Sequence, residues 1–107
     1  MKMEYSNTLI HDAINNYSHF SPNQQEVLNI LVDMSIDGQV VANITDIYKI
    51  ANSTRATVST AIAFLNKYGV IENTNSNGIK FTGCLIKQSK LNDIVSHYNK
   101  KLNLRKR

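Results

Sequence analysis

Apolar residues recur every three or four positions in five stretches of this 107-residue chain, the spacing of one buried helix face. The predicted helices cover residues 7–17, 22–36, 46–51, 55–68 and 89–103. In the fourth helix the expected buried stripe is Val58, Ala61, Ile62 and Leu65. Small polar residues fill the other side of that helix, so its two faces differ sharply in polarity.

Residues with known capping preferences mark the helix boundaries. The segment 21–24, Ser-Pro-Asn-Gln, predicts a capping box at the start of the second helix. Thr45 and Thr54 are expected to cap the third and fourth helices. Asn52 tolerates the left-handed conformation that a sharp turn between these two helices needs. Gly69 is placed for a left-handed C-cap of the fourth helix.

Short segments rich in β-branched residues predict a small sheet. Residues 70–74 and 79–82 flank an Asn-Ser-Asn-Gly turn, and Asn-Gly is a strong hairpin signal. Gly83 is expected to break this ribbon. Residues 39–44 predict an extended segment that pairs with the ribbon as a third strand. Residues 37–38, Asp-Gly, are expected to end the helix before it.

The order helix, turn, helix, ribbon resembles the winged helix-turn-helix superfamily of DNA-binding proteins. The resemblance rests on Thr54-Arg55-Ala56-Thr57-Val58-Ser59, followed by Leu65, Gly69-Val70-Ile71 and the hairpin. It implies a mainly α fold with a small β-hairpin (class α+β), and extra N- and C-terminal helices. Residues 1–107 then form one domain, with a core of about residues 20–86 and terminal helices of about residues 7–17 and 89–103.

The net charge of +4 is distributed unevenly. Residues 1–48 hold one cation, Lys2, and six of the eight acidic residues, whereas residues 49–107 hold the other eleven cations. This division suggests one face for a polyanion. It is equally compatible with a solvated surface that has no partner, and the helix-turn-helix order favours nucleic acid.

Several functional classes lack their sequence signatures. We expect no enzyme, because there is no phosphate-binding glycine loop and no nucleophile with a nearby base. Three histidines without ligand spacing predict no metal site, and no cofactor or small-molecule ligand is expected. We expect neither a membrane partner nor export, because the sequence has no apolar run long enough for a membrane span and no signal-peptide pattern. The single cysteine, Cys84, is expected to be a buried thiol, which fits a cytoplasmic protein.

The exposed face of the predicted helix 55–68 supplies candidate DNA contacts. Arg55 can reach a guanine edge or a phosphate, and hydroxyl groups can donate to phosphates or contact bases. A merely solvated helix would favour Glu, Lys and Gln, which have better helix propensity. The recognition helix of this family usually carries more cations than the two found here. The candidate residues are Thr54, Arg55, Ala56, Thr57, Ser59, Thr60 and Lys67.

A second set of candidate contacts lies in the ribbon and in nearby cations. Asparagine side chains can bind phosphates or minor-groove acceptors, although an Asn-rich tip is also simply a good turn. The candidates are Lys49, Asn75, Ser76, Asn77 and Lys80, with further backbone contacts from Lys87 and Lys90. The wing and the basic tail, residues 100–107, can outweigh the recognition helix in affinity.

The last predicted helix has a narrow apolar seam of Leu91, Ile94, Val95, Tyr98 and Leu102. Such a seam often pairs with its copy in a second chain, so we expect a homodimer built from both terminal helices. The alternative is that the helix folds back on the first helix and buries Leu9 and Ile14.

Together these features predict sequence-specific binding of double-stranded DNA. The protein is then a transcriptional regulator or an accessory protein of plasmid partition, replication or conjugative transfer. The alternative is a protein–protein docking module on a winged-helix scaffold without direct DNA readout, which the weakly cationic recognition helix supports.

Overall fold

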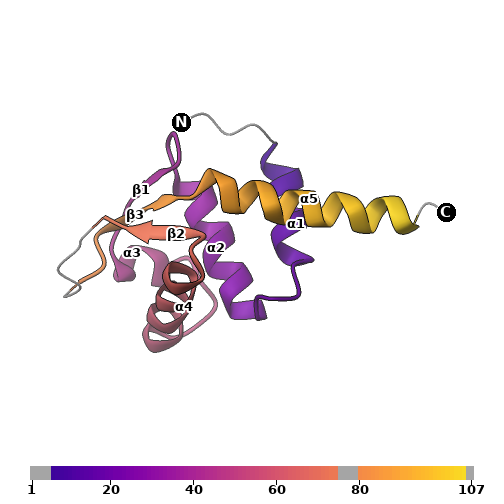
Figure 1. Cartoon of the computed structure of the whole chain (residues 1–107). Helices are drawn as coiled ribbons and strands as arrows, with labels where there is room; N and C mark the ends of the chain where they lie inside the picture. The colour runs from indigo at the N-terminus through magenta and orange to yellow at the C-terminus, as the bar shows by residue number, and fades with distance from the viewer. Residues whose placement is uncertain (1–5, 75–79, 106–107) are drawn as a thin grey trace.

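The computed structural model describes residues 6–74 and 80–105, with side chains as far as Asn103. Within these residues the chain forms five helices and one three-stranded antiparallel sheet (Figure 1). In chain order they are α1 (Asn7–Asn15), α2 (Pro22–Met34), β1 (Gln39–Val41), α3 (Ile44–Tyr48), α4 (Arg55–Tyr68), β2 (Ile71–Asn73), β3 (Gly83–Ile86) and α5 (Gln88–Arg105). The expectation of a mainly helical α+β fold is confirmed.

The strands lie in the order β1-β3-β2. The expected third strand is confirmed, because β1 pairs with β3 and places Val41 opposite Gly83. The prediction for the second ribbon strand is wrong: this strand is β3, and residues 80–82 precede it. Gly83 begins the strand instead of breaking the ribbon. A Cβ at Gly83 would lie 2.3 Å from the Val40 carbonyl oxygen, so the close approach of β1 and β3 requires glycine there.

Helix α2 begins as predicted and ends early. The Ser21 hydroxyl accepts a hydrogen bond from the Gln24 N–H, and the Gln24 side chain accepts one from the Ser21 N–H. The helix stops at Met34, so the predicted end at residues 37–38 is wrong. Asp37 and Gly38 instead have φ angles of 53° and 80°, which suit a tight two-residue turn.

Helix α3 starts two residues before its predicted position, because a different residue caps it. The Asn43 side chain accepts from the Asp46 N–H at 2.9 Å, and the Asp46 carboxylate accepts from the Asn43 N–H at 3.1 Å. Thr45 therefore lies inside the helix, and its predicted capping role is wrong. Asparagine and aspartate form a stronger reciprocal cap here than a lone threonine provides.

The core lies between α2, α4 and the inner face of the sheet. Leu28 and Leu31 of α2, Leu65 of α4, and Val40 and Cys84 of the sheet are buried. Burial raises the pKa of the Cys84 thiol to about 12, since a thiolate is poorly solvated there. The predicted buried thiol is confirmed.

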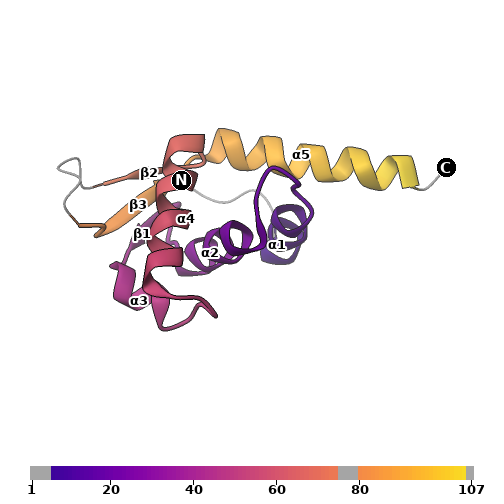
Figure 2. The same ribbon diagram turned by 90° about the horizontal axis from the view of Figure 1, so that it is seen from below.

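Helix α5 packs against α1, and α1 packs against α2. Ile14 is buried and Leu9 half-buried, so the fold-back alternative for the terminal helix is observed. The Lys101 ammonium donates to the Asn16 carbonyl oxygen at 3.2 Å, near the end of α1. In both views α5 extends past α1, away from α3 and the sheet (Figures 1 and 2). No helix in the described part of the chain is both long and apolar enough to cross a membrane.

Candidate nucleic-acid interface

A carboxylate from α2 holds the turn between α3 and α4. Glu26 accepts hydrogen bonds from the Asn52 N–H at 3.0 Å and from the Ser53 hydroxyl at 3.4 Å. The left-handed conformation expected at Asn52 is not observed: Asp37 alone has a positive φ among the described non-glycine residues. The turn therefore depends on a tertiary contact and not on a strained residue.

Helix α4 has the boundaries and the buried stripe that its sequence predicts. The Thr54 hydroxyl accepts from the Thr57 N–H at 3.1 Å and caps the start. Gly69 ends the helix with a φ of 96°, a conformation that glycine adopts without strain. The predicted stripe is buried, from Val58 to Leu65. These local features fix which side of α4 faces outward.

The outward side of α4 consists of small polar residues and alanine, with one cation near each end. This exposed face, defined here as the outer face of α4, comprises Arg55, Ala56, Ser59, Thr60, Ala63, Asn66 and Lys67. Thr54 is also exposed and Thr57 is half-buried. The expectation that the Ser/Thr side of this helix points to solvent is therefore confirmed. The alanine, serine and threonine side chains on this face are short, so another large molecule can approach the helix backbone closely.

A groove of about 530 Å³ lies between the outer face of α4, the start of α3 and the sheet. We call it the α3–α4 groove, and its lining includes Asn43, Thr45, Arg55, Ser59, Ala63, Asn73 and Lys80. It brings together two predicted cations, Arg55 and Lys80, from segments 25 residues apart in the sequence. The Asn73 Oδ1 atom is buried and has no hydrogen-bond partner among the described residues. The groove therefore offers donors from Arg55 and Lys80, whereas the Asn73 oxygen is not accessible from it.

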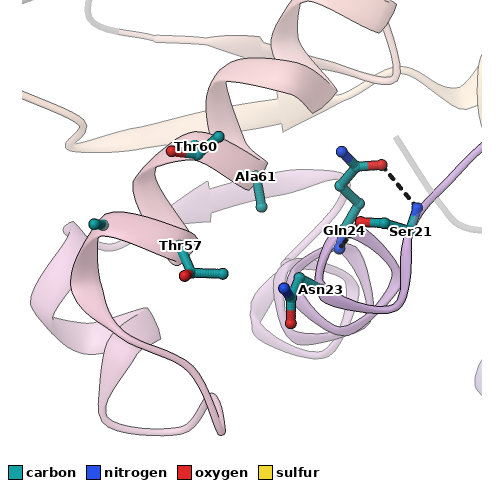
Figure 3. Close-up of a pocket in the computed structure, with 7 residues that line it drawn as sticks. Ser21, Asn23, Gln24, Thr57, Thr60 and Ala61 are labelled. Atoms are coloured by element: carbon teal, nitrogen blue, oxygen red, sulfur yellow. Dashed lines mark hydrogen bonds between the residues drawn. The ribbon is translucent and has the colours of Figure 1, made fainter.

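Part of the predicted recognition surface faces a second, smaller hollow of about 260 Å³ between α4 and the start of α2. Figure 3 shows Thr57 and Thr60 of α4 facing Asn23 and Gln24 of α2. Asn23 accepts a hydrogen bond from Ser53 at 3.2 Å. The predicted recognition residues thus divide between two sides of the helix.

Arg55, the first residue of α4, is tied to α3. Its Nη1 donates to the Thr45 hydroxyl oxygen at 2.8 Å. Its Cζ atom lies 5.3 Å from the centroid of the Tyr48 ring, within range of a cation–π contact. Because Asn43, and not Thr45, caps α3, the Thr45 hydroxyl is available to accept from Arg55.

The remaining predicted contacts are scattered. Lys49 is the exposed C-cap residue of α3, and Lys67 is exposed in the last turn of α4. Both lie outside the lining of the α3–α4 groove. Asn75, Ser76 and Asn77 lie outside the described residues, so their predicted contacts stay predictions.

Two further cations, predicted as backbone contacts, have protein partners. Lys87 pairs with Glu72 at 2.7 Å, and its hydrogen bond and charge lower the pKa of the Glu72 carboxyl. The Lys90 ammonium lies 5.6 Å from the centroid of the Tyr68 ring. Lys100 and Lys101 belong to α5, which extends away from α3 and the sheet (Figure 2). The contribution of these groups to a contact at α4 is therefore smaller than the sequence suggests.

Three polar residues that shape the site were not predicted. Asn43 caps α3, Glu26 holds the α3–α4 turn, and Asn66 accepts from the Asn73 N–H at 3.0 Å and ties β2 to α4. Asn43 has a local signal, since Asp46 follows at the capping-box spacing. Glu26 and Asn66 act across the fold, and the sequence carries no local sign of their partners.

Comparison of the chain with protein-family models, with curated proteins and with solved structures found no match.

Proposed function

We propose that this protein binds double-stranded DNA at specific sites as a winged helix-turn-helix protein, with α4 as the recognition helix. The element order α2-β1-α3-α4-β2-β3 and the strand order β1-β3-β2 support the winged-helix assignment. The observation that carries the proposal is the outer face of α4, which is exposed, consists mainly of small side chains, and has Arg55 at its start and Lys80 in the adjoining groove.

The chemistry of this face suits the DNA major groove. The major groove of DNA is about 12 Å wide and admits one α-helix, provided that the side chains between the helix and the bases are short. Ala56, Ser59 and Ala63 meet that condition. Cations at the border contact phosphates, which position the helix, and hydroxyl groups and Arg55 contact bases, which select the sequence.

The proposal extends to the role and assembly of the protein. A small DNA-binding protein of this kind acts as a transcriptional regulator or as an accessory factor in plasmid partition, replication or conjugative transfer. It acts without catalysis, in the cytoplasm, where Cys84 stays reduced. It acts as a homodimer through the terminal helices, because Leu102, the last position of the apolar seam of α5, is only half-buried within one chain.

A second candidate function is a docking module for another protein. It is favoured by two apolar side chains at the end of α3: Tyr48 is 38% exposed and Ile50 is 58% exposed. Large exposed apolar residues that lie together often belong to protein interfaces. In that case the protein is indifferent to DNA, and substitution of Ile50 removes partner binding.

The test compares two serine-to-glutamate variants. Ser59 lies on the outer face of α4, and Ser96 is an exposed residue of α5. Binding to mixed genomic fragments is titrated at ~50 and ~200 mM salt. We expect wild-type affinity to fall by roughly three to five decades between these concentrations if a dimer meets six to ten phosphates. Ser59→Glu should weaken binding by roughly tenfold or more, because it places a carboxylate beside phosphates.

Ser96→Glu is the matched control and should bind as the wild type does. If both variants bind DNA as tightly as the wild type does, α4 is not part of the DNA interface. Failure of the wild-type protein to retain any DNA at ~50 mM salt would favour the docking function.

A further inference from the structure

Arg55 is exposed, yet its side chain is fixed from two directions by α3. Its Nη1 donates to Thr45 Oγ1 at 2.8 Å, and its guanidinium lies over the Tyr48 ring. Exposed arginine side chains normally lose much rotamer freedom when they bind a partner. These two contacts restrict that freedom before any partner arrives.

The fixed guanidinium retains donors for a ligand. Arginine carries five N–H donors in one plane, and Thr45 takes one of them. The Arg55 Cζ atom lies over the face of the Tyr48 ring, 5.3 Å from its centroid. Arg55 and Thr45 both line the α3–α4 groove, so the remaining donors lie at the place where α4 would meet DNA.

We propose that Arg55 reads a guanine in the target duplex, and that Thr45 and Tyr48 are positioning residues that hold its guanidinium for that base. The proposal rests on the proposed DNA-binding function. Guanine presents two acceptors, O6 and N7, side by side in the major groove, and an arginine edge matches both at once. A phosphate contact does not require a fixed plane, and lysine serves it nearly as well.

The neighbouring residues are consistent with base contact. Ser59 lies one helical turn after Arg55, and Ala63 lies one turn further, both along the same groove. Their short side chains leave space for a base edge beside the guanidinium. The same row holds no acidic residue that would neutralise Arg55, since the described groove lining contains no carboxylate.

The experiment selects binding sites from a randomised duplex library with the wild-type protein, and then measures affinity for single-base variants of the selected site. We expect a guanine preference of roughly 5- to 150-fold at one position of each half-site. Arg55→Lys keeps the charge and removes the planar fork, so it should abolish that preference while keeping the salt dependence of binding.

The positioning role is tested with three variants. Thr45→Val keeps the side-chain shape without the acceptor, and Tyr48→Leu removes the aromatic ring; both should reduce the guanine preference. Tyr48→Phe keeps the ring and should restore it. Circular dichroism and thermal unfolding confirm that each variant folds, and the base preference separates positioning from a general loss of stability.

Each outcome decides between the proposals. An unchanged guanine preference in Arg55→Lys would overturn the base contact and assign Arg55 to a phosphate. A full preference in both Thr45→Val and Tyr48→Leu would overturn the positioning role. If the protein binds specific DNA sites but shows no guanine preference that requires Arg55, this inference is overturned and the proposed function stands. Absence of DNA binding by the wild type overturns both.

Discussion

Single polar side chains, rather than strained backbone, set the geometry of the α3–α4 segment. Asn43 and Thr54 cap the two helices, and Glu26 reaches from α2 to the turn between them. Each contact satisfies backbone N–H groups that a helix start or turn leaves without a partner. The position of Arg55 therefore depends on Asn43, Thr54 and Glu26.

Replacing Glu26 tests this dependence. Glu26→Ala removes the acceptor for the Asn52 N–H and should lower the free energy of unfolding by about 1 kcal/mol, measured by urea denaturation. Glu26→Gln keeps one oxygen for Asn52 and should lose less than half of that amount. Equal stability of Glu26→Ala and the wild type would show that the turn does not need the carboxylate.

A histidine links the first two helices. The His11 Nδ1 lies 2.7 Å from the Asn29 Oδ1, and its Nε2 lies 2.7 Å from the Asp33 carboxylate. Asn29 also donates to Asn15 at 2.8 Å, which orients its oxygen toward the histidine. Burial lowers the pKa of His11, but the hydrogen bonds to Asn29 and Asp33 and the nearby carboxylates raise it more, so the net pKa is raised. Both ring nitrogens then donate as the imidazolium.

This arrangement predicts a pH-dependent contribution to stability. Because the folded-state pKa of His11 is above the ordinary value of 6.5, the stabilisation is fully present below that pH. It is lost as pH rises through the raised folded-state pKa. The contribution should be less than about 1 kcal/mol, since the pair is partly exposed and screened. Urea denaturation at acidic and alkaline pH measures it.

His11→Gln should remove this pH-dependent difference, while His19→Gln, at an exposed position, should retain it. An identical pH profile for His11→Gln and the wild type would contradict the imidazolium assignment.

At the scale of elements, the sequence predicts the helix boundaries that depend on residues close together in the chain. The cap at Ser21, the cap at Thr54 and the stop at Gly69 are local, and the structure has all three. The start of α3 is missed because Asn43 and Thr45 compete as caps and the Asp46 partner decides. The second ribbon strand is missed because its position depends on pairing with β1, a distant segment.

Gly83 tests that pairing. Gly83→Ala should lower the free energy of unfolding by about 3 kcal/mol, because its Cβ would meet the Val40 carbonyl oxygen at 2.3 Å. Gly38→Ala is the matched control: its φ of +80° is also left-handed, but the nearest atom to an added Cβ is 3.8 Å away. Its cost should be about 1 kcal/mol. Equal losses in chemical denaturation would contradict the close approach of β1 and β3.

At the scale of the whole molecule, the proposed DNA contact of α4 and the proposed dimer contact of α5 lie in different parts of the structure. Helix α3 and the sheet lie at one end, and the end of α5 lies at the other (Figures 1 and 2). The principal extents of 49 × 28 × 21 Å reflect this elongated shape. The sequence predicted which face of α4 is exposed, because the polarity pattern of a helix is local. It could not predict that α5 carries its cations away from that face.

The dimer prediction belongs to this scale. The wild-type chain should sediment at twice its mass of 12.1 kDa, because α5 extends beyond α1. Leu102→Glu should give a monomer, since it places a charge on the half-buried seam, while Asn103→Glu, at an exposed position, should remain dimeric. A monomeric wild type at micromolar concentration would refute the dimer and leave DNA binding by α4 to be judged separately.

The most direct test of the central claim is site-specific cross-linking to duplex DNA. Cys84 is fully buried, so a cysteine introduced at Ala63 or at Ser96 is the reactive thiol for a short photo-activated cross-linker. Both positions are exposed, one on the outer face of α4 and the other on α5. We expect the probe at position 63 to cross-link to the bound duplex and the probe at position 96 not to do so. Cross-linking from position 96 but not from position 63 would show that α4 is not the element that meets DNA.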